Sequence, residues 1–232
     1  ERSSALWHVL DSVLPGDVLM VQAFGDPYTG CLGEMLTTYF KGRGGLGGHP
    51  GGQAANVATW ITRTNNKAVI VARVGNDPVG FALISDLDKC GVEHHGLMNS
   101  GRPSGVVVIL VDSNGERTMF PDNGANADLE VNDLPPLDDV DGVFLSGYAL
   151  LDFRSREAAI AMVHKFRERN IPIFFDPTTT GAMKAAPKSE ILEWVGMCDG
   201  ILLNNEEARY LGESDDIEEA EANLQKLTPL VV

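Results

Sequence analysis

The sequence predicts an α/β fold built on a mostly parallel sheet, and three observations support this. Short apolar runs rich in β-branched residues recur along the chain, at 17–24, 67–72, 142–146, 171–175, 200–203 and 230–232. These runs are continuously apolar rather than alternating, which is typical of strands buried on both faces of a sheet. Longer amphipathic stretches lie between them, at 78–90, 154–169 and 215–227. Strands therefore alternate with helices, as in a layered α/β fold.

The length of the chain favours one domain. With 232 residues, 44% of them hydrophobic, the chain is long enough for one substantial core and short for two independent ones. We therefore expect a single domain over residues 1–232. The sequence ends on the apolar run Leu230–Val232, so we expect this domain to be incomplete at its C-terminus.

Charge and cysteine content restrict the partners. Lys and Arg number 18 against 33 Asp and Glu, a net charge of −15, which repels nucleic acid and anionic membrane surfaces. No apolar run approaches the length of a membrane span, and no signal-peptide pattern begins the chain. Three widely spaced cysteines, Cys31, Cys90 and Cys198, favour a reducing compartment. We expect a cytoplasmic protein with no nucleic-acid or membrane partner.

Two segments, 33–49 and 104–121, interrupt the alternation of strands and helices. Within the second, Asn114-Gly115 separates two β-rich runs, which is a strong hairpin signal. We expect the two segments to form one small β-sheet, a lid that stands off the main domain. The alternative is that they are ordinary edge strands of the main sheet.

A glycine-rich segment, residues 44–58, provides the first candidate site. Glycines directly before an Ala-rich helix let a ligand approach the backbone, where first-turn N–H groups and the side chain of Asn56 can donate hydrogen bonds. The segment is not a P-loop, because no Lys-Ser/Thr pair follows the glycines, and it does not follow a buried strand as a dinucleotide-binding motif does. The pattern indicates a site for hydroxyls or anions.

The run Gly-Gly-Gln-Ala-Ala-Asn-Val-Ala at 51–58 resembles the N-terminal motif of the ribokinase-like (PfkB) family of sugar kinases, in which Gly-Gly-x-x-x-Asn contacts the sugar. Gly75 matches a later family glycine. Asn65 replaces a family Gly or Ser, a mild change because Asn also adopts the left-handed conformation that ends a helix. The resemblance runs from about residue 17 to the last residue and implies a three-layer α/β/α sandwich with a small β-sheet lid. It assigns four residues to the sugar: Gly51, Gly52, Gln53 and Asn56.

The resemblance also implies an Asp after the first strand that accepts hydrogen bonds from two sugar hydroxyls. If the first strand is 17–24, Asp26 has this role. If it is 31–36, the position falls on Thr38, which has no carboxylate. We prefer Asp26, because the second placement leaves too few residues for a lid and leaves a good strand unexplained.

Two later strand ends resemble further parts of the family site. Residues 144–148 resemble the strand end beside the sugar, which makes Gly147 and Tyr148 substrate-binding candidates. Asp176 matches the position where the family places an acidic or amide side chain facing the phosphates. Two alternatives stay open: Tyr148 as a core aromatic residue and Asp176 as a turn or capping residue.

Residues 204–207, Asn-Asn-Glu-Glu, resemble the family's Asn-x-x-Glu element near the metal and phosphates. Asn204 would lie on the phosphate side and Glu207 would hold Mg²⁺ through water, since Mg²⁺ prefers hard oxygen ligands. The family usually has Glu at the position of Asn205. An acidic first helical turn also stabilises a helix through its dipole, so a purely structural role is the alternative.

The family places its catalytic Asp in a Gly-Ala-Gly-Asp element that also forms an anion hole, and nothing here matches it. We therefore predict no catalytic residue in this chain and expect the chain as given to be inactive. The resemblance implies ATP- and Mg²⁺-dependent phosphorylation of a hydroxyl of a sugar, sugar-like molecule or nucleoside, and a homodimer through the lid. The alternatives are a non-catalytic sugar-binding or regulatory relative and a nucleotide-dependent oxidoreductase, which lacks its glycine fingerprint.

Overall fold

The computed structural model describes residues 18–20, 46–48, 51–95, 98–99, 101–111 and 117–232. The chain divides into two compact units. The first comprises Glu1–Gly51 and Val108–Phe120, and the second comprises Gly52–Val107 and Pro121–Val232.

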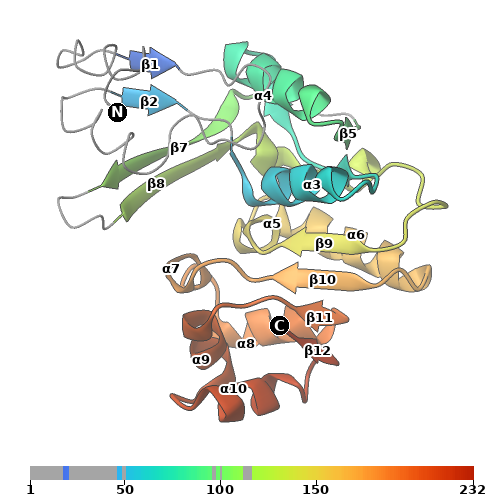
Figure 1. Cartoon of the computed structure of the whole chain (residues 1–232), viewed down its shortest axis with the longest axis vertical. Helices are drawn as coiled ribbons and strands as arrows, with labels where there is room; N and C mark the ends of the chain where they lie inside the picture. The colour runs from blue at the N-terminus through green and yellow to red at the C-terminus, as the bar shows by residue number, and fades with distance from the viewer. Residues whose placement is uncertain (1–17, 21–45, 49–50, 96–97, 100, 112–116) are drawn as a thin grey trace. The chain divides into compact units, whose positions relative to one another are not determined.

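A four-stranded parallel sheet forms the centre of the second unit (Figure 1). Its order is β12-β11-β10-β9, and its strands are β9 (Val143–Ser146), β10 (Ile173–Asp176), β11 (Gly200–Ile201) and β12 (Leu230–Val231). Each neighbouring pair is parallel. Between the strands lie α5 (Tyr148–Leu151), α6 (Arg156–Glu168), α7 (Thr180–Met183), α8 (Lys188–Gly196), α9 (Asn205–Gly212) and α10 (Ile217–Leu224). The predicted alternation of parallel strands with helices is confirmed.

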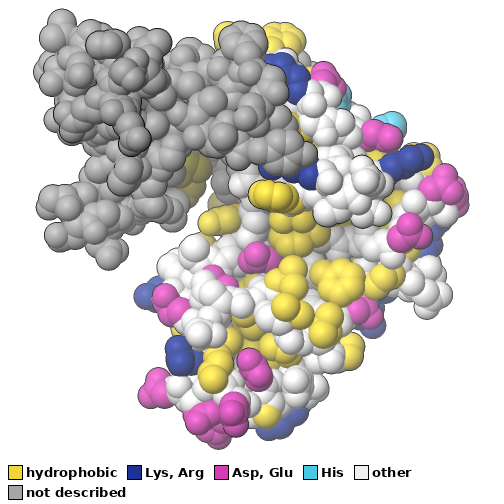
Figure 2. Space-filling model, viewed as in Figure 1, with side chains coloured by type: hydrophobic (Ala, Val, Ile, Leu, Met, Phe, Trp, Pro, Cys, Tyr) yellow, Lys and Arg dark blue, Asp and Glu magenta, His cyan; other side chains and the backbone are white. Residues whose placement is uncertain are grey.

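The predicted amphipathic stretches form helices whose apolar faces are buried. In α6, Ala159, Val163 and Phe166 are buried together with Met162, as the spacing of apolar residues predicts. The third stretch is shorter than predicted, because Asp216 caps α10 by accepting hydrogen bonds from the N–H groups of the second and third residues after it. The acidic residues of α10 face solvent, and Figure 2 shows acidic side chains gathered over that end of the described surface.

The main core of the second unit packs the central sheet against its helices. The largest fully buried side chains include Ile173, Phe175 and Ile201 from the strands, with Val163 from α6 and Val195 from α8. β10 lies between β9 and β11, and Phe175 packs in the main core, where it is only 1% exposed. Phe175 directly precedes Asp176, so this core supports the strand end where the candidate site lies.

The N-terminal part of the second unit has a smaller core. It contains α3 (Gln53–Arg63), β3 (Val69–Ile70), β4 (Val74–Gly75), α4 (Pro78–Lys89), β5 (Glu93–His94) and β6 (Met98–Asn99). β3 pairs with β5 and β4 with β6, both parallel. Asn65, just after α3, has a φ of 60°, the left-handed conformation that the sequence predicts for this helix end.

The predicted hairpin is confirmed in its pairing, since β7 (Ser104–Val111) and β8 (Arg117–Gly124) form a two-stranded sheet. Its Asn-Gly turn lies outside the described residues. In the first unit, β1 (Val18–Met20) pairs in parallel with β2 (Leu46–Gly48). The described part of segment 33–49 thus pairs with an earlier strand, while β7 and β8 pair with each other. The rest of that segment lies outside the described residues.

The alternative that these segments are edge strands of the main sheet is not supported in the described residues, because the central sheet contains only β9 to β12 there. No helix in the described ranges is long and apolar enough to cross a membrane.

A buried carboxylate, Asp152, links the end of α5 to β8. It accepts hydrogen bonds from Asn123 Nδ2 at 2.7 Å and from the backbone N–H of Arg154 at 2.9 Å, and it pairs with the Arg154 guanidinium at 3.0 Å. Burial opposes ionisation of Asp152, but the hydrogen bonds from Arg154 and Asn123 outweigh it and hold its pKa low, from an ordinary 3.8 to about 2.

We expect Asp152→Asn to lower the free energy of unfolding at pH 7 by roughly 2 kcal/mol. Because the folded pKa lies below the unfolded one, the carboxylate stabilises the fold above about pH 4, and this contribution is lost as pH falls towards 2. Urea unfolding at both ends of this window measures the effect. Asp138→Asn is the control, since Asp138 forms an exposed ion pair with Arg169 worth less than about 1 kcal/mol. If Asp152→Asn lowers the free energy of unfolding by the same amount at both pH values, the prediction is wrong.

Candidate functional site

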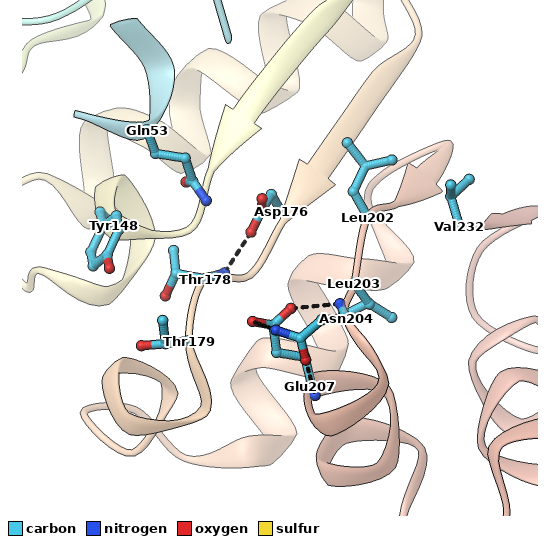
Figure 3. A pocket seen from close by; sticks show the side chains of 10 residues that line it. All are labelled: Gln53, Tyr148, Asp176, Thr178, Thr179, Leu202, Leu203, Asn204, Glu207 and Val232. Atoms are coloured by element: carbon cyan, nitrogen blue, oxygen red, sulfur yellow. Dashed lines mark hydrogen bonds between the residues drawn. The ribbon is translucent and has the colours of Figure 1, made fainter. Parts of the chain in front are cut away.

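A pocket of ≈ 450 Å³ opens at the carboxyl ends of the strands of the central sheet (Figure 3). All of its lining residues belong to the second unit: Gln53, Tyr148, Asp176, Thr178, Thr179, Leu202, Leu203, Asn204, Glu207 and Val232. They come from the start of α3 and from the segments that follow β9, β10, β11 and β12. Open α/β sheets bind ligands at this edge, so the pocket is the candidate site.

The pocket brings together five of the residues that the sequence singled out, from four separate segments: Gln53, Tyr148, Asp176, Asn204 and Glu207. Gly147, Gly51, Gly52 and Asn56 are not among the residues that line it. Asp26 and Thr38 lie outside the described residues, so the choice between them stays a prediction.

Gly52 opens α3 in a conformation that favours glycine. It is the N-cap residue with a φ of 115°, which residues with a side chain rarely adopt. No side chain among the described residues caps this helix end, so its first N–H groups are available as donors. Asn56 is exposed and its backbone N–H donates to the carbonyl oxygen of Gly52 at 3.0 Å.

Gln53, the first residue of α3, is anchored to the end of β9. Its Oε1 accepts a hydrogen bond from the hydroxyl of Ser146. Figure 3 shows the amide nitrogen of Gln53 turned towards Asp176, the orientation that a nearby carboxylate favours because nitrogen is the donor end of the amide. The amide therefore presents a donor to the pocket. Ser146 was not predicted, although it directly precedes the predicted Gly147.

Asp176 shapes the turn after β10. One oxygen of its carboxylate accepts from the backbone N–H of Thr178 at 2.8 Å, and its carbonyl oxygen accepts from the N–H of Gly147 at 2.8 Å. This is the turn-forming role that the sequence left open. Because the same residue lines the pocket, the turn role does not remove it from the site.

Tyr148 begins α5 and is 39% exposed. This exposure argues against the alternative of a core aromatic residue. Its ring and hydroxyl stand at the pocket wall in Figure 3, where they offer a ligand both an apolar surface and a hydrogen-bonding group.

Asn204 and Glu207 form a reciprocal capping box at the start of α9. Asn204 Oδ1 accepts from the N–H of Glu207 at 3.0 Å, while Glu207 Oε2 accepts from the N–H of Asn204 at 2.9 Å. Glu207 Oε1 also accepts from Asn204 Nδ2 at 2.6 Å. The two side chains therefore have the structural role that the sequence left as an alternative.

Glu207 and Asp176 supply the negative charge of the site. Burial raises the pKa of Glu207; the hydrogen bond from the Asn204 N–H opposes this, and the nearby Asp176 carboxylate adds to it. A bound cation reduces the electrostatic repulsion between two carboxylates that lie close together at a partly buried position. Asp176, Asn204 and Glu207 provide hard oxygen donors of the kind that Mg²⁺ prefers, with water completing its coordination. No group of three or more His, Cys, Asp or Glu that could hold a metal occurs in the described part of the chain.

Five residues of the pocket were not predicted from the sequence: Thr178, Thr179, Leu202, Leu203 and Val232. Each follows the end of a strand within a few positions, and this placement is the signal that could have found them. Leu202 and Val232 carry no chemistry of their own, so composition alone gave no reason to select them.

Comparison with known proteins identifies the class to which this fold and site belong. Residues 44–232 match the family described as "pfkB family carbohydrate kinase". The chain therefore belongs to the pfkB family of carbohydrate kinases.

Its relatives include sugar kinases from distant organisms. Fructokinase of Klebsiella pneumoniae is 29% identical over 193 residues, which cover 80% of this chain and 63% of the relative. A putative sugar kinase of Pyrococcus horikoshii is 26% identical over 170 residues, 70% of this chain and 54% of the relative. The chain thus spans less than two thirds of the length of these relatives.

Solved structures agree on the fold. The fructokinase of Vibrio cholerae O395 with fructose, ADP and calcium ion bound has a TM-score of 0.68 at 25% identity, covering 78% of this chain and 61% of that one. The adenosine kinase of Sinorhizobium meliloti has a TM-score of 0.75 at 20% identity, covering 95% and 66%. The predicted ribokinase-like α/β fold is confirmed.

Proposed function

We propose that this chain belongs to an enzyme that transfers the terminal phosphoryl group of ATP to a hydroxyl of a sugar or sugar-like molecule, nucleosides included. One observation carries the proposal. The chain is a pfkB family member whose pocket, at the carboxyl ends of parallel strands, gathers hydrogen-bonding side chains with two carboxylates. Fructokinases among its relatives support a sugar as the substrate class.

The residues divide into two groups in this proposal. The substrate group comprises Asp26, Gly51, Gly52, Gln53, Asn56, Gly147 and Tyr148. The phosphate group comprises Asp176 and Asn204, with Glu207 holding Mg²⁺ through water. Mg²⁺, when bound, neutralises phosphate charge. Gln53 would donate to a hydroxyl, and its anchor on Ser146 would hold that donor in place before the ligand arrives.

We infer the nucleotide and the metal from membership of the family and from the oxygen atoms that the pocket offers as metal ligands. The Vibrio cholerae fructokinase was solved with ADP, and the Pyrococcus horikoshii sugar kinase with ATP, which supports ATP as the phosphoryl donor. We assign the catalytic base to no residue of this sequence. The alternative of a non-catalytic sugar-binding relative gains no support from these comparisons.

We also propose a cytoplasmic location and a homodimer that forms through the segments 33–49 and 104–121. Val106 and Val107, adjacent on β7, are 48% and 52% exposed. Since neighbouring strand residues point to opposite faces, both faces of this part of the hairpin present apolar surface, which is a physical reason to associate.

The proposal is tested on the full product of the gene that encodes this chain, with MgATP and D-fructose, D-ribose or adenosine in a coupled assay. We expect ATP-dependent phosphorylation of at least one of the three. Asp26→Ala should weaken binding of that substrate by one to two decades, about 1.5–3 kcal/mol, the strength of charge-assisted hydrogen bonds. Thr38→Ala should change it little.

Calorimetry on both variants decides between the two placements of the substrate Asp. If Thr38→Ala abolishes binding while Asp26→Ala has no effect, the first strand is 31–36 and the assignment of Asp26 is wrong. If the unsubstituted protein phosphorylates none of the three compounds, the proposed activity is wrong for this substrate class.

A further inference from the structure

Thr178, on the wall of the pocket, combines two unfavourable features. Its φ is 72°, in the left-handed region, which a β-branched residue adopts only with strain. Its side chain is buried, with the residue only 3% exposed, yet its hydroxyl has no hydrogen-bond partner among the described residues. An unpaired buried hydroxyl lowers stability, so folding alone gives no reason to keep one here.

The neighbouring threonines show that the missing partner is particular to Thr178. Thr179 caps α7 by accepting from the N–H of Ala182 at 3.3 Å, and the Thr180 hydroxyl donates to Glu206 Oε1 at 2.5 Å. The backbone N–H of Thr178 is also paired, since it donates to the Asp176 carboxylate. The turn is therefore well hydrogen-bonded apart from this one hydroxyl.

We propose that the Thr178 hydroxyl is a further substrate-binding group, which forms a hydrogen bond with a hydroxyl of the sugar in this pocket. The strained turn that Asp176 closes places the residue between Tyr148 and the capping box of α9 (Figure 3). Because no hydrogen bond holds it, the hydroxyl can rotate about the Cα–Cβ bond towards a ligand without breaking one. Gln53 and Tyr148, two of the substrate-binding residues proposed above, line the same pocket and favour a sugar hydroxyl as its partner. This inference rests on the proposed sugar kinase function.

The test compares Thr178→Val with Thr228→Val in the full gene product. Thr178→Val removes the hydroxyl and keeps the shape and the β-branching. We expect affinity for the best-bound of D-fructose, D-ribose and adenosine to fall about tenfold, the loss of one neutral hydrogen bond, with an equal or higher Tm.

The Thr228 hydroxyl is equally buried but donates to the carbonyl of Cys198 at 3.0 Å. Thr228→Val should therefore lower Tm and leave the affinity unchanged. Thr178→Ser, which retains the hydroxyl, should bind within about threefold of the unsubstituted protein.

Calorimetry with the sugar and, separately, with ADP and MgCl₂ distinguishes the outcomes. Unchanged sugar affinity in Thr178→Val, a loss confined to ADP, or an unsubstituted protein that binds none of the three compounds would each overturn the inference. A protein that binds the sugar with the expected dependence on Thr178 but does not phosphorylate it would instead contradict the proposed activity and leave the role of Thr178 supported.

Discussion

Gly147→Ala is expected to weaken sugar binding about a hundredfold and to lower the free energy of unfolding by about 1–3 kcal/mol. A β-carbon at this position would lie 2.8 Å from the carbonyl carbon and oxygen of Pro177 and 2.9 Å from the carbonyl oxygen of Asp176. These are backbone atoms, which cannot rotate away. The turn that carries Asp176 and Thr178 must therefore move. A shift of about 1 Å at a binding site can lower the activity or affinity of that site about a hundredfold.

The matched control is Gly196→Ala at the end of α8, where nothing lies within 4 Å of an added β-carbon. Alanine is the better helix former, so this variant should be as stable as the unsubstituted protein or more stable by up to about 1 kcal/mol. Calorimetry with the best-bound sugar and urea unfolding measure both variants. If Gly147→Ala binds the sugar normally, the close approach of the β9 and β10 ends does not position the site.

Phe175→Ala is expected to lower the free energy of unfolding by about 3–5 kcal/mol. The ring is 1% exposed on β10, which is enclosed by β9 and β11. Removing it leaves a cavity in the core between the central sheet and its helices, which the closely packed neighbours cannot fill completely, so both the lost burial and the cavity contribute. A loss of this size is a large part of the stability of an ordinary domain.

Phe153→Ala makes the same chemical change at a surface position, since Phe153 is 80% exposed. Phe153→Ala removes a contact with the Arg154 guanidinium, which lies 6.0 Å from the ring centroid, and we expect an effect below about 1 kcal/mol. Denaturant unfolding of the two variants side by side gives the comparison. Similar losses in both would show that the core of the central sheet is wrongly assigned.

The sequence predicted the parallel sheet and its helices because both leave strong local patterns. The run 171–175, which contains most of β10, is continuously apolar, and α6 repeats apolar residues at helical spacing. The pairing of Leu46–Gly48 with Val18–Met20 could not be predicted, because it depends on contacts distant in the sequence. The candidate residues that line the pocket lie at the ends of strands and the starts of helices. The pattern of apolar residues predicts such positions well.

The role of Thr178 left no signal in the sequence. A left-handed backbone is predicted from Gly or Asn, as at Asn65, but not from a β-branched residue. Likewise, the pairing of Gln53 with Ser146 joins residues 93 positions apart, and only the fold brings them together. The capping box of Asn204 and Glu207 was foreseeable, because its spacing is local.

The strands of the central sheet stand side by side in the order in which they occur in the chain, from β9 to β12. Each new strand therefore adds to the edge left by the one before it, and none has to insert between two strands that are already paired. Growth of this kind needs only contacts between consecutive strand and helix units, whose loop-closure entropy is small. The part of the molecule that builds the pocket wall can thus assemble in the direction of synthesis, one unit at a time.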